Sequence, residues 1–133
     1  MKATDKDIVL SFVKAINDHN VNKIVSLMSD DHIFIDGIGQ KVIGKDPMKA
    51  GWEAYYKLFP DYMIDVQEIT EKGAIFGLFG YAKATYKNQV NKLNTNFWRT
   101  PASWKAIVEN NKIKLWQVYC DYSELLKIIG KNK

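Results

Sequence analysis

Residues 30–39 read Asp-Asp-His-Ile-Phe-Ile-Asp-Gly-Ile-Gly, and this stretch decides the fold because an apolar strand here follows a helical region. Side chains two apart on a strand share a face, so we expect His32, Phe34 and Asp36 to point to one side. The isoleucines between them then point to the other side. The pattern predicts a strand over residues 32–36 that ends in a carboxylate beside an aromatic ring.

The carboxylate of Asp36 has two interpretations. A carboxylate held beside apolar surface loses solvation and becomes a usable general base near neutral pH. Asp-Gly is also a strong turn signal, so Asp36 and Gly37 can instead simply close a hairpin. Both interpretations remain open from the sequence.

The composition is that of a globular protein. The chain has 133 residues, of which 47% are hydrophobic, 26% charged and 13% aromatic. A chain of this length forms one ordinary domain, which we expect to span residues 1–133. The aromatic share is well suited to lining a cavity.

The basic residues do not indicate a polyanionic partner. The formal net charge is +4, but Arg99 is the only arginine and the lysines are scattered along the chain. Base reading and bidentate phosphate contacts favour arginine, so we expect no nucleic-acid partner. No apolar run approaches the length needed to span a bilayer, so no membrane partner is expected.

Cys120 is the only cysteine, which rules out a disulfide within the chain. A reducing compartment therefore fits best. The residues that follow Met1 contain no apolar segment of the kind found in secretory signals. We expect a cytoplasmic protein.

Helices and strands can be placed from periodicity and capping residues. Apolar residues at helical spacing predict four helices, from Thr4 to about Asn17, from Asn20 to Met28, from Asp46 to about Leu58, and from Asp121 to Gly130. Alternation and turn residues predict strands over residues 32–36, 41–43, 62–70, 74–86, 95–109 and 113–120, with a polar loop over 87–94.

Two features modify these predictions. Gly77 and Gly80 permit a bend in the strand that contains them, whereas Pro101 indicates a bulge or an edge. In the third helix, Asp46 is predicted as the N-cap and Pro47 as the first helical residue.

The order of elements predicts an α+β fold. Two helices, a strand, a short strand and a third helix precede a four-strand antiparallel meander and a closing helix. A strongly curved antiparallel sheet wrapped around the helices makes a cone that encloses a pocket.

The residues that carry a family resemblance are spread along the chain: 30–39, Gly44, Phe59-Pro60-Asp61, Trp98, Trp104, Lys112-Ile113, Trp116, Asp121, Leu125-Leu126 and Gly130. With them the chain resembles a SnoaL-like protein, in the superfamily shared by nuclear transport factor two and ketosteroid isomerase. The resemblance covers nearly the whole chain. It implies the cystatin-like cone and a homodimer through the open sheet face, but not one activity, because the superfamily contains isomerases, cyclases, dehydratases and binding domains.

The similarity to ketosteroid isomerase implies a role for Asp36. It places Asp36 at the position of that enzyme's general base. It also places Phe12 where the isomerase has its tyrosine, and about Ser103 where it has its protonated aspartic acid. Losing one such hydrogen-bond donor typically costs about 10²–10³-fold in rate, so steroid isomerisation is not expected.

Two further residues are candidates for proton transfer. Asp121 looks similar to the acid/base aspartate of SnoaL-type polyketide cyclases, but it is equally well placed to cap the last helix with Glu124. His32 shares a strand face with Asp36 and titrates near neutral pH. Its alternative is a half-exposed histidine paired with a neighbouring carboxylate.

Aromatic residues from a helix and several strands are candidates to contact a substrate: Phe12, Phe34, Trp52, Tyr55, Trp98, Trp104 and Trp116. Core packing is the alternative for each of them. Alternation places Arg99 on the face opposite Trp98.

No metal or cofactor is expected. Two distant histidines and one cysteine give no metal-ligand spacing. The stretch from Gly39 to Asp46 comes close to a phosphate-binding loop, but Asp46 replaces the hydroxyl residue that holds magnesium.

Two functions follow as hypotheses. The first is a cofactor-free isomerase, cyclase or lyase, in which Asp36 moves a proton on an apolar carbonyl compound with assistance from His32 or Asp121. The second is a ligand-binding or accessory dimerisation domain without catalysis. Both imply a small apolar ligand as the partner. A protein-recognition role would require a large exposed apolar patch beyond the dimer face.

Overall fold

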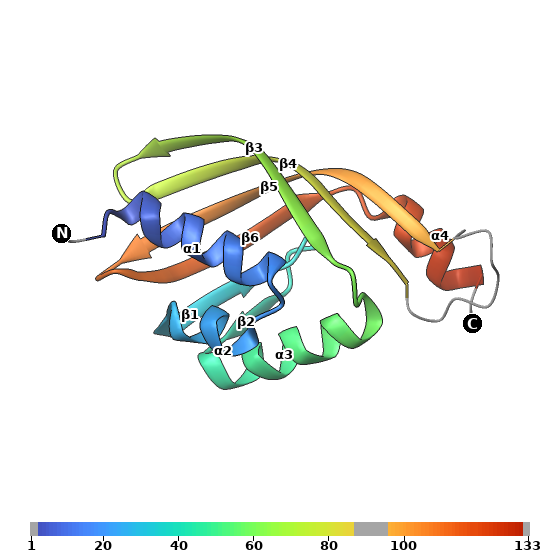
Figure 1. Ribbon diagram of the computed structural model, residues 1–133, viewed down its shortest axis with the longest axis horizontal. Helices are drawn as coiled ribbons and strands as arrows, with labels where there is room; N and C mark the ends of the chain where they lie inside the picture. The colour runs from blue at the N-terminus through green and yellow to red at the C-terminus, as the bar shows by residue number, and fades with distance from the viewer. Residues whose placement is uncertain (1–2, 87–95, 132–133) are drawn as a thin grey trace.

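The computed structural model describes residues 3–86 and 96–131, which form four helices and one six-stranded sheet (Figure 1). The elements are α1 (Asp5–Asn17), α2 (Val21–Ser26), β1 (Met28–Ile35), β2 (Lys41–Ile43), α3 (Lys45–Leu58), β3 (Met63–Lys72), β4 (Ile75–Thr85), β5 (Phe97–Glu109), β6 (Lys112–Cys120) and α4 (Ser123–Lys131). The predicted α+β fold is confirmed. The predicted loop over 87–94 lies outside the described residues.

The sheet has the strand order β2-β1-β6-β5-β4-β3. Strands β3 to β6 form the predicted antiparallel meander, β1 joins β6 in parallel, and β2 pairs antiparallel with β1. Helix α1 packs on β3, β5 and β6, whereas α3 packs on β1 and β2. Figure 1 shows the sheet arching over the first three helices, while α4 lies at the end of β5 where that strand begins.

The core lies between the concave face of the sheet and these helices. Alternate residues of β5 are buried: Trp98, Thr100, Ala102, Trp104, Ala106 and Val108. They meet the buried face of α1, to which Phe12 and Ile16 contribute. The alternation follows from strand geometry, in which every second side chain faces the core.

The start of α1 has the predicted capping box. The Thr4 side chain accepts the Asp7 N–H at 3.1 Å, and the Asp7 carboxylate accepts the Thr4 N–H at 3.0 Å. Two backbone donors that the helix leaves without partners are thereby satisfied.

The sheet bends where β3 has a bulge between Val66 and Glu68, opposite Gly80 of β4. A Cβ atom on Gly80 would lie 1.8 Å from the carbonyl oxygen of Asp65. Only glycine allows the two backbones to approach so closely, so the predicted bend at Gly80 has a steric basis.

Strand β1 begins at Met28, four residues earlier than the sequence predicted. Met28 pairs with Ile113 of β6, and the Ile113 N–H donates to the carbonyl oxygen of Leu27 at 2.7 Å. Helical spacing assigned Met28 to the second helix because pairing with a distant strand cannot be read from local periodicity. Long-range pairing overrides the local preference.

Helix α3 begins at Lys45, and its N-cap is Gly44 with φ 103° and no side-chain hydrogen bond. The predicted N-cap role of Asp46 is therefore wrong, because Asp46 lies within the first turn. There its carboxylate still interacts favourably with the positive end of the helix dipole.

Pro101 occupies a local edge. It pairs with Tyr81 on β4, but the pairing of β5 with β6 begins only at Ala102. The edge interpretation of Pro101 is thus the correct one. Within residues 3–86 and 96–131, no helix combines the length and apolar character that crossing a membrane requires.

Candidate functional site

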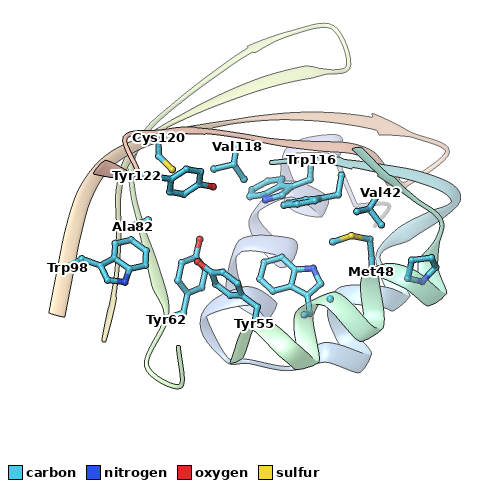
Figure 2. A pocket seen from close by; sticks show the side chains of 14 residues that line it. Val42, Met48, Tyr55, Tyr62, Ala82, Trp98, Trp116, Val118, Cys120 and Tyr122 are labelled. Carbon is cyan, nitrogen blue, oxygen red and sulfur yellow. The ribbon is translucent and has the colours of Figure 1, made fainter. Parts of the chain in front are cut away.

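A cavity of about 180 Å³ lies between α3 and the inner face of the sheet (Figure 2). Its walls come from five strands beside α3 and from residues that adjoin β3 and β6. The lining residues are Phe34, Val42, Pro47, Met48, Gly51, Trp52, Tyr55, Tyr62, Ala82, Trp98, Trp116, Val118, Cys120 and Tyr122. The lining is mainly aromatic and aliphatic, and none of the described residues in it carries a formal charge at neutral pH.

Helix α3 forms the floor of the cavity. Met48, Trp52 and Tyr55 follow one another at spacings of four and three residues, so they share a helix face. The rings of Trp52 and Tyr55 meet edge to face, with centroids 6.2 Å apart at 83°. This arrangement is favourable for aromatic pairs and gives the floor a defined shape.

Most of the predicted aromatic contacts line the cavity: Phe34, Trp52, Tyr55, Trp98 and Trp116. The structure places Phe12 and Trp104 behind the wall instead. The Phe12 ring is fully buried 5.0 Å from the ring of Trp116, and the Trp104 ring stacks on Trp116 at 6.4 Å. Both therefore support a wall residue from the core side.

Three tyrosines form one end of the cavity. Figure 2 shows the hydroxyl groups of Tyr55, Tyr62 and Tyr122 at the same end of the cavity. The rings of Tyr55 and Tyr62 are perpendicular, with centroids 4.9 Å apart. Burial is the main cause that raises the pKa of each of the three hydroxyls, so all remain protonated at neutral pH.

Tyr122 is held in place by two neighbours. Its hydroxyl accepts the Gly37 N–H at 3.4 Å and interacts with the thiol of Cys120. Burial raises the pKa of the Cys120 thiol, and the interaction with Tyr122 partly offsets that rise. A Cβ atom on Gly37 would lie 2.5 Å from the Tyr122 ring, so a larger residue here would displace that ring.

The Asp36 carboxylate shapes the turn after β1. Its Oδ1 accepts the N–H groups of Ile38 and Gln40, both at 3.0 Å, and its carbonyl oxygen accepts the Gly39 N–H at 3.0 Å. Asp36 is half-buried and is not among the residues that line the cavity. Burial is the largest cause that raises the pKa of Tyr122, a cavity residue. The negative charge of Asp36 adds slightly to that rise.

His32 lies in the core. It has no exposed surface, and its Nδ1–H donates to the carbonyl oxygen of Ile113 at 2.7 Å. Its Nε2 has no hydrogen-bond partner within the part of the chain that the structure describes. Burial lowers the pKa of the ring. The alternative of a half-exposed histidine is therefore wrong, because the side chain lies in the core, with its ring 6.2 Å from the ring of Phe12 on α1.

Asp121 is exposed at the start of α4. Its Oδ1 accepts the Ser123 N–H at 2.9 Å, and this bond is the main cause that lowers the pKa of the carboxyl group. It does not line the cavity.

Arg99 lies on the outer face of the sheet, as the alternation predicted. Its guanidinium is 3.6 Å from the centre of the Tyr81 ring.

The described residues contain no group of three His, Cys, Asp or Glu side chains arranged to hold a metal ion. The polar side-chain groups of the described lining residues are hydroxyls, a thiol and indole N–H groups. Such a lining can hold an uncharged organic molecule by ring contacts and a few hydrogen bonds.

Sequence reasoning missed two of the cavity tyrosines. Tyr122 continues an alternation with Trp116, Val118 and Cys120, each of which lines the cavity. That period of two is a signal that the sequence contains. Tyr62 follows the proline that ends α3, and its position depends on how α3 packs against the sheet, which no local pattern reveals.

Solved structures with the same fold cover almost the whole chain. One is a protein from Catenulispora acidiphila with a ketosteroid isomerase-like fold, crystallised with trimethylamine, which is 16% identical with a TM-score of 0.81 over 96% of this chain and 95% of its own. Another, from Shewanella denitrificans and described as a candidate SnoaL-like polyketide cyclase, is 12% identical with a TM-score of 0.81 over 98% and 99%. A cystatin-fold protein from Novosphingobium aromaticivorans is 16% identical with a TM-score of 0.72 over 88% and 98%.

These identities establish the fold and not the activity. No curated protein matches the sequence. The model of the SnoaL-like domain matches residues 9–103, which is more than half of the chain. The chain therefore belongs to the SnoaL-like domain family.

Proposed function

We propose that this protein binds a small, uncharged ring compound in the cavity between α3 and the sheet. The observation that carries the proposal is the lining, which is aromatic and aliphatic and holds no charged side chain. A buried ion would have no countercharge there, whereas an apolar ring gains from leaving water. The uncharged lining favours binding over acid/base chemistry within the cavity.

The size of the cavity limits the ligand. A cavity of about 150 Å³ lined by apolar side chains is large enough to bind benzene. The volume of about 180 Å³ therefore suits one ring with a short substituent. A multi-ring polyketide or steroid would require the wall side chains to move.

Binding can be tested with toluene, α-methylstyrene and acetophenone as probes. We expect at least one of them to raise the melting temperature, because a ligand at 100 times its Kd stabilises a protein by about 2.7 kcal/mol. Val118→Phe fills the cavity and should abolish the effect. Val13→Phe changes a half-buried valine on α1 that does not line the cavity, so it is the matched control and should retain the effect.

The proposal fails if none of these probes binds the wild-type protein by calorimetry. It also fails if Val118→Phe binds them as tightly as Val13→Phe does, because the ligand would then lie elsewhere.

A second candidate is proton transfer by Asp36, with His32 or Asp121 assisting. The observation that favours it is the contact of the Asp36 turn with Tyr122, a cavity residue, through the Gly37 N–H. In this reaction a carboxylate takes a proton from the carbon next to a ligand carbonyl and a proton is then returned to carbon.

Exchange of the methyl protons of acetophenone in D₂O, followed by NMR, tests this second candidate. We expect the wild-type protein to accelerate exchange, and Asp36→Asn to lower the acceleration by about 10²-fold or more. Asp65→Asn, an exposed carboxylate on β3, is the control. Exchange at the rate of buffer, or equal rates for Asp36→Asn and wild type, rules the candidate out.

We also propose that two copies pair through the outer face of the sheet. Strand alternation places large apolar side chains there on three strands: Ile43 on β2, Phe79 on β4 and Tyr119 on β6, which are 63%, 47% and 48% exposed. An exposed apolar face of this kind supports association, and a two-fold axis lets the same face serve both copies.

The location of the protein remains a prediction. Cys120 is the sole cysteine and its thiol is half-buried beside Tyr122. We propose a reducing compartment such as the cytoplasm, because no disulfide contributes to this fold.

A further inference from the structure

We infer that the hydroxyls of Tyr55 and Tyr62 donate hydrogen bonds to a carbonyl oxygen of the ligand, so that the site selects neutral aromatic ketones and aldehydes. The inference rests on the proposed function, because it assigns polar contacts within the same cavity. It adds a chemical class and two specificity-determining residues, neither of which is a candidate for proton transfer.

The first observation is the position of these hydroxyls. Tyr55 comes from α3 and Tyr62 from the segment before β3, yet both point to the same end of the cavity (Figure 2). Tyr62 is only 7% exposed, and its ring packs at right angles to Tyr55. The remaining walls are apolar, so a ligand that fills the cavity meets polar atoms mainly at this end.

The second observation is that both donors are unused. Within the described parts of the chain, neither the Tyr55 nor the Tyr62 hydroxyl has a hydrogen-bond partner, whereas the adjacent Tyr56 donates to the carbonyl oxygen of Ile16 at 2.7 Å. Buried polar groups nearly always have partners. A ligand oxygen at this end of the cavity would provide one.

The other polar atoms of the lining are less available. The Tyr122 hydroxyl accepts the Gly37 N–H and interacts with the thiol of Cys120. The indole nitrogens of Trp52 and Trp98 have no partner in the described residues, but both atoms are covered by protein. Tyr55 and Tyr62 are therefore the donors that remain for a ligand.

The charge of the lining excludes two alternatives. A carboxylate or phosphate ligand would find no cation among residues 3–86 and 96–131, because no Lys, Arg or His of these ranges lines the cavity. An ammonium ion could lie against the aromatic rings, but it would leave both hydroxyls without an acceptor. A carbonyl oxygen accepts two hydrogen bonds and carries no charge, so it matches the two donors.

The test compares acetophenone with α-methylstyrene, in which a CH₂ group replaces the carbonyl oxygen and the planar shape is kept. We expect calorimetry to give about tenfold tighter binding of acetophenone by the wild-type protein. Tyr62→Phe and Tyr55→Phe should each lower the affinity for acetophenone by about three- to tenfold and change the affinity for α-methylstyrene by no more than about twofold. Tyr56→Phe, which removes a hydroxyl outside the cavity, should not change the ratio.

Equal affinities of the wild-type protein for acetophenone and α-methylstyrene would overturn the inference, as would tighter binding of tetramethylammonium than of acetophenone. The inference would also be overturned if Tyr55→Phe and Tyr62→Phe lowered the affinities for acetophenone and α-methylstyrene equally. The hydroxyls would then affect only the packing of the cavity. If no ring compound binds the wild-type protein, the proposed pocket function itself fails. If the wild-type protein binds ring compounds but does not prefer the ketone, this inference fails and the proposed pocket function stands.

Discussion

Individual residues that do not line the cavity position the strands and side chains that form its wall. His32 and Gly37 do not line the cavity, yet each fixes part of the structure around it. His32 ties β1 to β6 through its bond to the Ile113 carbonyl oxygen, and Gly37 supports the Tyr122 ring. Both make predictions that need no ligand.

Protonation of His32 should destabilise the fold. Burial lowers its pKa in the folded state below the unfolded value of about 6.5, so the unfolded state binds the extra proton more readily. Stability is therefore complete above about pH 6.5 and falls as the pH drops through 6.5 toward the folded pKa. We expect urea unfolding to show that the free energy of unfolding falls more between pH 7.5 and pH 5 for the wild type than for His32→Gln. Equal losses in the two proteins contradict the account.

Gly37→Ala should displace the Tyr122 ring, because the added Cβ would lie 2.5 Å from it. We expect a loss of about 1–3 kcal/mol in the free energy of unfolding and weaker binding of ring probes. Gly130→Ala is the matched control, since a Cβ there meets no atom within 4 Å and alanine favours a helix. Chemical denaturation of both variants measures the difference. A Gly37→Ala variant as stable as Gly130→Ala would show that the ring has room to move.

The candidate site could be read from the sequence only in part. Alternation and helical spacing identified five aromatic residues that line the cavity, among them Trp52 and Trp98. The same patterns could not tell a wall residue from one behind the wall, so Phe12 and Trp104 looked equivalent to them. That difference depends on depth within the packed core, which local periodicity does not encode.

At the scale of elements, the bulge in β3 and Gly80 in β4 set the curvature that opens the cavity. The sequence showed where the sheet could bend, but not which residues of β3 would carry the bulge. Register across strands depends on long-range pairing, as it does for Met28 in β1.

Gly80→Ala should strongly destabilise the fold, because its Cβ would lie 1.8 Å from a backbone oxygen that cannot move freely. We expect a loss of about 2–4 kcal/mol in the free energy of unfolding. In Gly77→Ala the new Cβ meets the Thr70 side chain at 3.0 Å, and that side chain can rotate, so the loss should be smaller. The explanation of the curvature is wrong if the two variants lose equal stability.

For the whole molecule, the curved sheet presents two different faces. Its inner face encloses the cavity, and its outer face carries the exposed apolar residues Ile43, Phe79 and Tyr119. The order of elements predicted a curved sheet over the helices, and the family resemblance added the cystatin-like cone.

If two copies associate through the outer face, lysines introduced on that face should separate the dimer. We expect light scattering with size exclusion to give twice the chain mass for the wild type, and the monomer mass for Phe79→Lys combined with Tyr119→Lys. Leu126→Lys changes a 63% exposed apolar residue on α4 and should leave the dimer intact. A wild-type monomer, or a dimer that survives the paired lysines, contradicts this assignment.

A crystal structure of the protein grown with acetophenone would test ligand binding in the cavity most directly. We expect electron density for the ring between Trp52 and Trp116, with the ketone oxygen within about 3 Å of the Tyr55 and Tyr62 hydroxyls. Density for the ligand only on the outer sheet face, or an empty cavity at saturating acetophenone, would contradict it.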